Sequence, residues 1–221
     1  MEPSDWQERF SRQTILASVG EAGQRKWARS SLGVLGGGTA LESALTALIS
    51  SGLTRLRLGV PGTFDLPAWQ HRFPEADLAR LDPAADGKHL DGFLVLTEDE
   101  AERRRWSRSL RAQGRPAFFG WTAGSGTALF FAPHASSDCP CFECFEVLNP
   151  KTFQGGTAET RRLLGALAAA EVLQWLVKGE TPLANQVWIT SLEGGLSVRH
   201  PVEPSAKCPA GLLARGAKVT P

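Results

Sequence analysis

Apolar residues recur along this chain in short runs that polar and glycine-rich segments separate. Runs of the length expected for buried strands lie at residues 32–35 (LGVL), 91–96 (DGFLVL), 116–121 (PAFFGW) and 127–133 (TALFFAP). Residues 55–60 (RLRLGV) alternate between polar and apolar side chains, which predicts a strand with one partly solvated face.

Other segments predict helices. Residues 39–52 have apolar side chains at helical spacing, at Leu41, Ala44, Leu45 and Leu48. The charged segment 99–114 and residues 159–179, which end at Gly179, are also expected to be helical. A further helix is expected near the N-terminus, where Ser4 and Gln7 form a capping box.

The order of these elements predicts an α/β fold, because strands and helices alternate through most of the chain. Segments 186–192 and 195–202 flank Glu193-Gly194-Gly195 and predict a terminal β-hairpin. The proline-rich, polar residues 65–89 are expected to form loops with at most one helical turn. The sheet should therefore be parallel at first and antiparallel late.

Composition narrows the function classes. With 221 residues, 42% of them hydrophobic and 21% charged, the chain suits one folded domain over 1–221. A net charge of +1 gives no reason to expect nucleic acid or an anionic membrane as a partner. The apolar runs are far shorter than a bilayer span and the N-terminal segment is too polar for a signal peptide, so a cytoplasmic location is expected.

The glycine-rich segment 33–48 (GVLGGGTALESALTAL) has the strand, turn and helix that hold nucleotide phosphates at a helix amino end. Leu41 stands where such a turn usually has its third glycine, and Glu42 follows it. We expect Glu42 in the first helical turn, where its carboxylate neutralises the helix dipole and repels a triphosphate. The pattern therefore predicts weak ATP binding or none.

Three stretches together resemble the MoeB/ThiF/HesA family, the relatives of ubiquitin-activating enzymes. They are residues 9–27, residues 32–58, and the pair formed by 140–145 (PCFECF) and 200–209 (HPVEPSAKCP). The resemblance implies a Rossmann-like ThiF/MoeB fold, in which a parallel sheet is extended by antiparallel strands. It also implies dimers that use ATP and magnesium to adenylate the C-terminal glycine of a ubiquitin-like or sulfur-carrier protein.

The resemblance assigns several nucleotide-site positions. Gly36 and Gly38 match the glycine turn. Glu98, in Thr97-Glu98-Asp99, stands where the family has its magnesium-binding aspartate, and Arg103 follows where the family also has arginine. Arg72 lies one residue from the position of a phosphate-contacting arginine and could replace it.

Other positions depart from the family. The acid that grips the ribose hydroxyls falls on Val60, and a second acid falls on Gly62. The chain is also short between His71 and Asp91, where the family has a helix, a strand and an ATP-contacting lysine. These departures imply a catalytically degenerate member.

Arg9 and Arg12 match the family pattern, whereas several residues of the nucleotide site do not. The resemblance implies that residues 1–30 form dimerisation helices and that Arg12, with Arg9 beside it, reaches the ATP phosphates of the partner. A solvated helix face is the alternative interpretation of both arginines. Trp6 and Trp27 flank this region and are candidates for a dimer surface.

The rest of the domain is expected to consist of a shortened nucleotide-binding half (31–100), an antiparallel half with a zinc clip (101–211) and a tail (212–221).

The cysteines are crowded, with three of the four in residues 139–144 (CPCFEC) and the last at position 208. Such clustering indicates a metal clip rather than scattered disulfides. The resemblance implies that Cys141, Cys144 and Cys208 are three of four ligands of a structural zinc ion, with Gly211 in place of the fourth. Cys139, His200 and His134 remain candidates for that position, and free thiols remain the alternative to zinc.

The sequence and the resemblance together predict two alternative functions. The first is a non-catalytic subunit that forms a homo- or heterodimer with a ThiF-family protein, or pairs with a biosynthetic enzyme, and donates Arg12 to the ATP site of its partner. The second is an active adenylyltransferase with a rebuilt pocket. In both, the substrate is the C-terminus of a ubiquitin-like protein, a sulfur carrier or a peptide.

Overall fold

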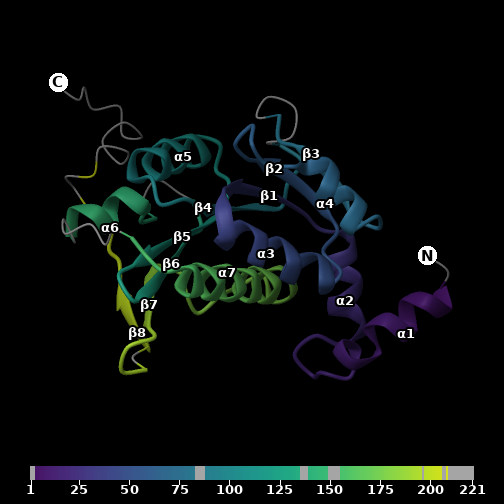
Figure 1. Cartoon of the computed structure of the whole chain (residues 1–221). Helices are drawn as coiled ribbons and strands as arrows, with labels where there is room; N and C mark the ends of the chain where they lie inside the picture. Colours follow the sequence, from purple (N-terminus) through teal and green to yellow (C-terminus); the bar gives the residue numbers. More distant parts are fainter. Residues whose placement is uncertain are drawn as a thin grey trace.

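The computed structural model describes residues 3–82, 88–134, 139–148, 155–195, 197–205 and Cys208 (Figure 1). Its centre is an eight-stranded sheet in the order β3-β2-β1-β4-β5-β6-β7-β8. The strands are β1 (Ser31–Gly36), β2 (Arg55–Gly59), β3 (Asp77–Arg80), β4 (Gly92–Leu96), β5 (Ala117–Ala123), β6 (Gly126–Ala132), β7 (Gln186–Ser191) and β8 (Ser197–Pro201). Neighbours from β3 to β5 pair in parallel, and those from β5 to β8 pair antiparallel. This confirms the predicted fold class.

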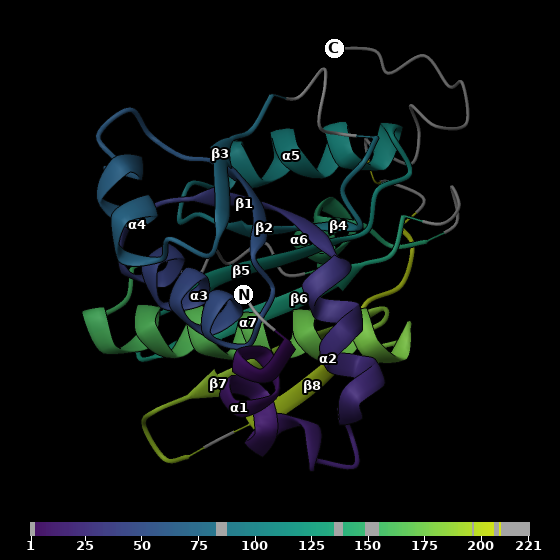
Figure 2. The ribbon, with the colours of Figure 1, turned by 90° about the vertical axis from the view of Figure 1, so that its right-hand side faces the viewer.

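Helices cover both faces of the sheet. They are α1 (Pro3–Thr14), α2 (Gly20–Arg29), α3 (Gly38–Ser50), α4 (Leu66–Arg72), α5 (Glu100–Ala112), α6 (Phe142–Leu148) and α7 (Ala158–Lys178). Figures 1 and 2 show α5 on one side of the sheet and α3 with α7 on the other. Each side has its own apolar cluster, as a three-layer α/β architecture requires.

The core forms because β1 and β4 are apolar on both faces. Leu32 and Val34 belong to the cluster beneath α3 and α7, whereas Leu35 belongs to the cluster on the α5 side. The helices α3 and α7 lie close together at Gly165, where an added Cβ would be 2.2 Å from the carbonyl oxygen of Ala40. Within the described residues, no helix is both long enough and apolar enough to cross a bilayer.

The expectation of loops over residues 65–89 is wrong. Helix α4 and strand β3 lie there, and β3 pairs in parallel with β2 at the sheet edge. In β3 only Leu78 is buried, so the strand lacks the periodic pattern that would predict it. Hydrogen bonding to β2 forms the strand instead. The segment between His71 and Asp91, which is short compared with the family, therefore still contains a strand.

Three smaller expectations also differ from the structure. Helix α1 begins at Pro3, so Ser4 lies inside the helix rather than at its N-cap, and α6 is an unexpected short helix. Trp27 is 6% exposed and donates its indole N–H to the carbonyl of Leu173, so it joins α2 to α7 instead of marking a dimer surface. The side chain of Trp6 and the tail 212–221 lie outside the described residues.

Candidate functional site: a cavity at the strand ends and a cysteine cluster

A cavity of about 720 Å³ lies at the carboxyl ends of β1, β2, β3 and β4. Strand order reverses between β1 and β4, which is where open α/β sheets bind their ligands. The lining residues that carry the argument below are Gly36, Gly38, Val60, Arg80, Glu98, Asp99, Glu102, Arg105 and Arg161.

The glycine turn opens the amino end of α3 toward this cavity. Gly36 has φ +126°, and a Cβ there would lie 1.7 Å from the carbonyl oxygen of Leu96. Gly37 is the N-cap residue and makes no side-chain capping bond, and Gly38 begins the helix with φ +67°. The first N–H groups of α3 are therefore left for a ligand or water, an arrangement that favours anions.

The expectation that Glu42 lies in the first turn of this helix and repels phosphate is wrong. Helix α3 begins at Gly38 and has no acid in its first turn. Four residues of helical rise, roughly 6 Å, carry Glu42 past the cavity. It is exposed and instead lines a separate groove of about 530 Å³ with Arg72 and Arg162. The predicted repulsion of phosphate by Glu42 therefore has no structural basis.

Three carboxylates line the cavity, and each already accepts hydrogen bonds within the chain. Glu98 accepts from the Thr122 hydroxyl at 2.8 Å. Asp99 caps α5 by accepting from the backbone N–H groups of Ala101 (2.8 Å) and Glu102 (3.2 Å). Glu102 accepts from the Thr97 hydroxyl at 2.7 Å. These carboxylates are therefore engaged in local structure.

Three arginines line the same cavity and also have partners. Arg80 donates to the carbonyl of Val60 at 3.2 Å. Arg105 pairs with Glu102 at 3.5 Å, and Arg161 lies 3.8 Å from Glu98. None of the three arginines was predicted from the sequence, because they come from β3, α5 and α7 and no local spacing links them.

Val60 follows β2 and lines the cavity, where the resemblance places the ribose-binding acid. A valine side chain has no hydrogen-bond acceptor. Arg80 donates to the backbone carbonyl of Val60, and its guanidinium group has no acceptor either. The end of β2 therefore offers no carboxylate to a ribose.

Two of the candidate arginines are engaged in packing away from the cavity. Arg103 is 4% exposed, donates to the carbonyl of Thr97 at 2.5 Å and lies over the rings of Trp121 and Phe142. Arg72 lies over the ring of Trp69, and its groove is the one that contains Glu42. The structure therefore places both outside the lining of the main cavity.

The two N-terminal arginines differ in their surroundings. Arg9 forms an ion pair with Glu75 at 2.5 Å, which ties α1 to the segment after α4. Burial, the largest single effect, raises the pKa of the Glu75 carboxyl, but the hydrogen bond and charge of Arg9 together with a backbone hydrogen bond outweigh it and lower that pKa. Arg12, one helical turn further, is exposed. Beyond it, Ile15 and Leu16 are 80% and 51% exposed. Arg12 therefore lies on a solvent-facing surface and not beside the cavity of its own chain.

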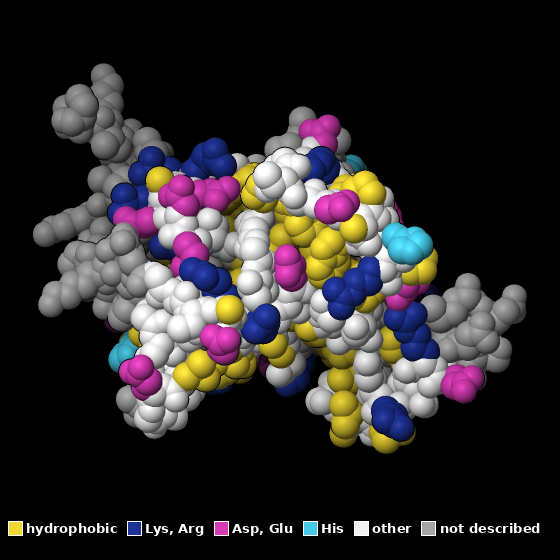
Figure 3. All heavy atoms as spheres, in the orientation of Figure 1, with side chains coloured by type: hydrophobic (Ala, Val, Ile, Leu, Met, Phe, Trp, Pro, Cys, Tyr) yellow, Lys and Arg dark blue, Asp and Glu magenta, His cyan; other side chains and the backbone are white. Residues whose placement is uncertain are grey.

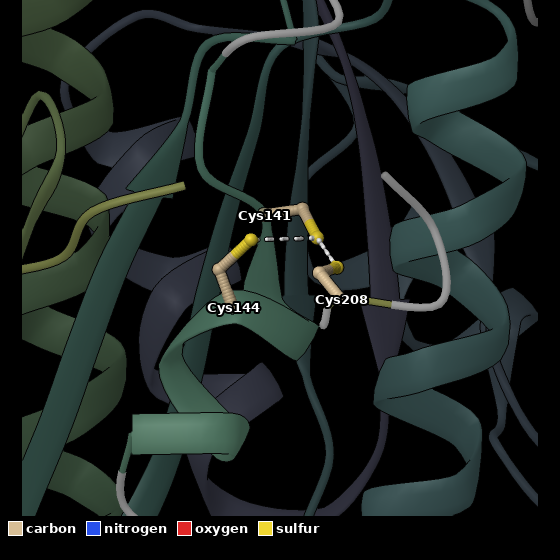
Figure 4. Close-up of side chains that lie close together, drawn as sticks. All are labelled: Cys141, Cys144 and Cys208. Atoms are coloured by element: carbon tan, nitrogen blue, oxygen red, sulfur yellow. Dashed lines mark hydrogen bonds between the residues drawn. The ribbon is translucent and has the colours of Figure 1, made fainter. Parts of the chain in front are cut away.

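The second candidate site is a cluster of three buried cysteines (Figure 4). The Sγ atom of Cys141 lies 3.8 Å from that of Cys144 and 3.5 Å from that of Cys208. All three sulfur atoms lie within 4.8 Å of one another. Hydrogen bonds from Cys141 and Cys208 lower the pKa of the Cys144 thiol, so this sulfur is the first of the three to become a thiolate. Thiolates at this spacing suit a metal ion.

The other ligand candidates lie apart from this cluster. The carbonyl of Cys139 accepts from Arg111 at 2.8 Å, and its sulfur is not among the three grouped ligand atoms. His134 is buried and bonds through Nδ1 to the carbonyl of Arg115, and His200 is exposed on β8. Gly211 lies outside the described residues.

No family model and no curated protein matches this sequence. Solved structures do match. E. coli MccB with SeMet MccA has a TM-score of 0.71 at 15% identity, over 95% of this chain and 76% of MccB. E. coli MccB with ATP has a TM-score of 0.69 at 16% identity, over 92% and 73%. PaaA has a TM-score of 0.68 at 13% identity, over 91% and 84%.

The chain has a ThiF-like fold. At sequence identities of 13–16% these likenesses show a shared fold and say nothing about a shared reaction. The resemblance in the sequence and the likeness in structure agree on that architecture, although they rest on different observations. Basic and acidic side chains are interspersed over the face seen in Figure 3, in keeping with the net charge of +1.

Proposed function

We propose that this chain is a non-catalytic ThiF-fold subunit that pairs with an active adenylating homologue or biosynthetic enzyme. The partner would adenylate the C-terminus of a peptide or a ubiquitin-like protein. One observation carries the proposal: every carboxylate that lines the described cavity is engaged within the chain, and the end of β2 carries Val60. The structures of MccB with ATP and with MccA support the substrate class.

The resemblance implies carboxylate oxygens for both magnesium and the ribose, and this cavity does not offer them freely. Mg²⁺ is usually bound by one or two carboxylates together with substrate phosphates. Glu98 would have to exchange its bonds to Thr122 and Arg161, and Asp99 would have to leave the end of α5. A hydrogen bond to a charged group contributes roughly 1.5–3 kcal/mol, so each exchange weakens ATP·Mg binding.

Arg12 supports the partner role. It lies on α1, outside the lining of the cavity, and is exposed, as are the apolar side chains of Ile15 and Leu16 that follow it in the chain. The planar fork of a guanidinium bridges phosphate oxygens in a way that a lysine does not. A donated Arg12 would therefore act on the ATP phosphates of the partner while its own chain binds none.

Calorimetry of the full chain with ATP and magnesium tests the missing nucleotide site. We expect no heat of binding at millimolar ATP. The variant Val60→Asp, which restores an acceptor at the end of β2, is expected to gain measurable binding. A dissociation constant in the low micromolar range for the unmodified chain would overturn the proposal.

A second function is favoured by the cavity itself. Its volume of about 720 Å³, the open amino end of α3 and three arginines suit an anionic nucleotide. In this case the chain is an adenylyltransferase in which Glu98 holds magnesium and Arg161 and Arg105 contact phosphates. Exchange of labelled pyrophosphate into ATP, abolished by Glu98→Ala, would support this function and exclude the first.

The donated arginine needs its own experiment. A partner that co-purifies with the chain is assayed for adenylation with the unmodified subunit and with Arg12→Ala. We expect a loss of ten-fold or more in the rate, about 1.4 kcal/mol or more of transition-state stabilisation. Arg25→Ala, on the exposed face of α2, is the matched control and should leave the rate unchanged. Equal rates for both variants would contradict the role of Arg12.

A further inference from the structure

We propose that Cys141, Cys144 and Cys208 bind one soft metal ion through three thiolates and leave its fourth coordination position to a small, exchangeable non-protein ligand. This site is independent of the nucleotide cavity and goes beyond the proposed function. It differs from a closed structural zinc site, in which four protein ligands surround the ion.

The sulfur positions fit a tetrahedral ion. With metal–sulfur bonds of about 2.3 Å, two ligands of a tetrahedral centre lie about 3.8 Å apart. The measured separations are 3.8 Å for Cys141 and Cys144 and 3.5 Å for Cys141 and Cys208. A disulfide would need sulfur atoms about 2 Å apart, and none of the three cysteines forms one. Thiolates select zinc and other soft ions over magnesium or calcium.

The fourth ligand is the distinguishing feature. In the described part of the chain, the cluster contains three ligand atoms and no other histidine, cysteine or carboxylate. The residues around and after Cys208, 206–207 and 209–221, contain no cysteine, histidine, aspartate or glutamate in the sequence. The segment that carries the family's last cysteine therefore has no side chain of these types to close the site, whatever its conformation.

Two further candidates in the described part of the chain lie apart from the cluster. The sulfur of Cys139 is not grouped with the three other sulfur atoms, and the ring of His134 bonds through Nδ1 to the carbonyl of Arg115 at 2.8 Å. Either side chain would need a local rearrangement to reach the three sulfur atoms. A water molecule or a small thiol needs none.

An ion pair between a buried glutamate and a half-exposed arginine holds the start of α6, where two of the ligands lie. Glu143, between Cys141 and Cys144, is 3% exposed and accepts from Arg108 of α5 at 2.8 and 2.5 Å. This pair fixes α6 against α5 in the way that outer contacts orient metal ligands. The two cysteines of this segment are therefore held in position, and Cys208 from the C-terminal segment already lies 3.5 Å from Cys141.

Cobalt(II) is the probe that tests the open position. The full chain, reduced and kept without oxygen, is titrated with cobalt, and the sulfur-to-cobalt charge-transfer and d–d bands are recorded. We expect one ion per chain. Added imidazole or 2-mercaptoethanol should shift the d–d bands in a saturable manner without releasing the metal. The charge-transfer intensity should fall by about a third in Cys208→Ser and stay unchanged in Cys139→Ser.

Several results would overturn the proposal. They are d–d bands that do not respond to added ligands, a loss of charge-transfer intensity in Cys139→Ser, or the absence of stoichiometric binding. X-ray absorption of the zinc-loaded unmodified chain keeps the test independent of whether a variant folds. It should give three sulfur neighbours at about 2.3 Å and one lighter atom, whereas four sulfur neighbours would contradict the open site.

Discussion

Gly36 and Gly38 lie two residues apart in the turn, both with positive φ, and yet they meet different surroundings. At Gly36 an added Cβ would lie 1.7 Å from a backbone oxygen of β4, which cannot move without breaking the sheet. At Gly38 an added Cβ meets nothing within 4 Å. The first glycine is therefore required by packing and the second by conformation alone.

This difference predicts unequal effects of the same substitution. Gly36→Ala should lower the free energy of unfolding by more than about 4 kcal/mol, among the largest effects of single substitutions. Gly38→Ala should cost about 1–2 kcal/mol, the usual cost of a left-handed conformation. Urea unfolding of the two variants measures both values. Equal losses would contradict the packing role of Gly36.

His134 makes stability depend on pH. Burial lowers the pKa of His134 from 6.5 to about 4, although the Arg115 carbonyl opposes the shift. Between these values the unfolded chain binds a proton that the folded chain does not. Stability is therefore present above pH 6.5 and falls as the pH drops toward 4, by about 1.4 kcal/mol per pH unit.

The variant His134→Asn tests this contribution. Asparagine tolerates the φ of +48° at this position and does not titrate. We expect the decline of unfolding free energy between pH 6.5 and 4 to become shallower by roughly 3 kcal/mol in total. His200→Asn, on exposed β8, is the control and should follow the unmodified chain. Parallel profiles for His134→Asn and the unmodified chain would contradict the assignment.

At the scale of elements, the contact between α3 and α7 decides how the helices cover the sheet. Both helices contribute to one buried cluster, and their backbones approach at Gly165. Leu41, which stands in place of a third glycine, is fully buried in this cluster. The glycine that permits a close approach therefore lies in α7 and not in the nucleotide turn.

Gly165→Ala is expected to lower the free energy of unfolding by about 1–3 kcal/mol, because the new methyl group overlaps the backbone of α3. Helix propensity alone predicts the opposite sign, a gain of about 1 kcal/mol. Ala170→Gly, at an exposed position of the same helix, is the matched control and should cost about 1 kcal/mol. Chemical unfolding decides between packing and propensity, and stabilisation by Gly165→Ala would contradict the close contact.

At the scale of the whole molecule, one sheet separates two apolar clusters. Trp27 belongs to the cluster on the α7 side and Trp121 to the cluster on the α5 side. Because β1 and β4 contribute side chains to both clusters, neither cluster can lose its packing while the sheet stays intact. We therefore expect both to unfold together.

Fluorine NMR of the chain labelled with 5-fluorotryptophan measures this coupling. The signals of Trp27 and Trp121, assigned with the variants Trp27→Phe and Trp121→Phe, should disappear at the same urea concentration. Coincident transitions are the mark of a single cooperative unit. Two separate midpoints would show that the two sides of the sheet unfold independently.

Much of the fold could be predicted because its signals are local. The apolar runs at 32–35 and 91–96, the helical spacing in α3 and α7, and the glycines at 194 and 195 each depend on neighbouring residues. Strand β3 could not be predicted in this way, because a four-residue edge strand with one buried side chain carries no periodic signal. The strand forms because its backbone pairs with β2.

The sequence by itself determined most of the strands and helices, the glycine turn and the cysteine spacing, since each of these depends on residues that are near one another in the chain. Only the tertiary structure decided which charged groups share the cavity. It brought Arg80, Arg105 and Arg161 together from three distant elements, and it buried Arg103 and turned Glu42 away. The physical reason is that a side chain reaches a site through the packing and rotation of its whole helix or strand, which its own sequence neighbours do not encode.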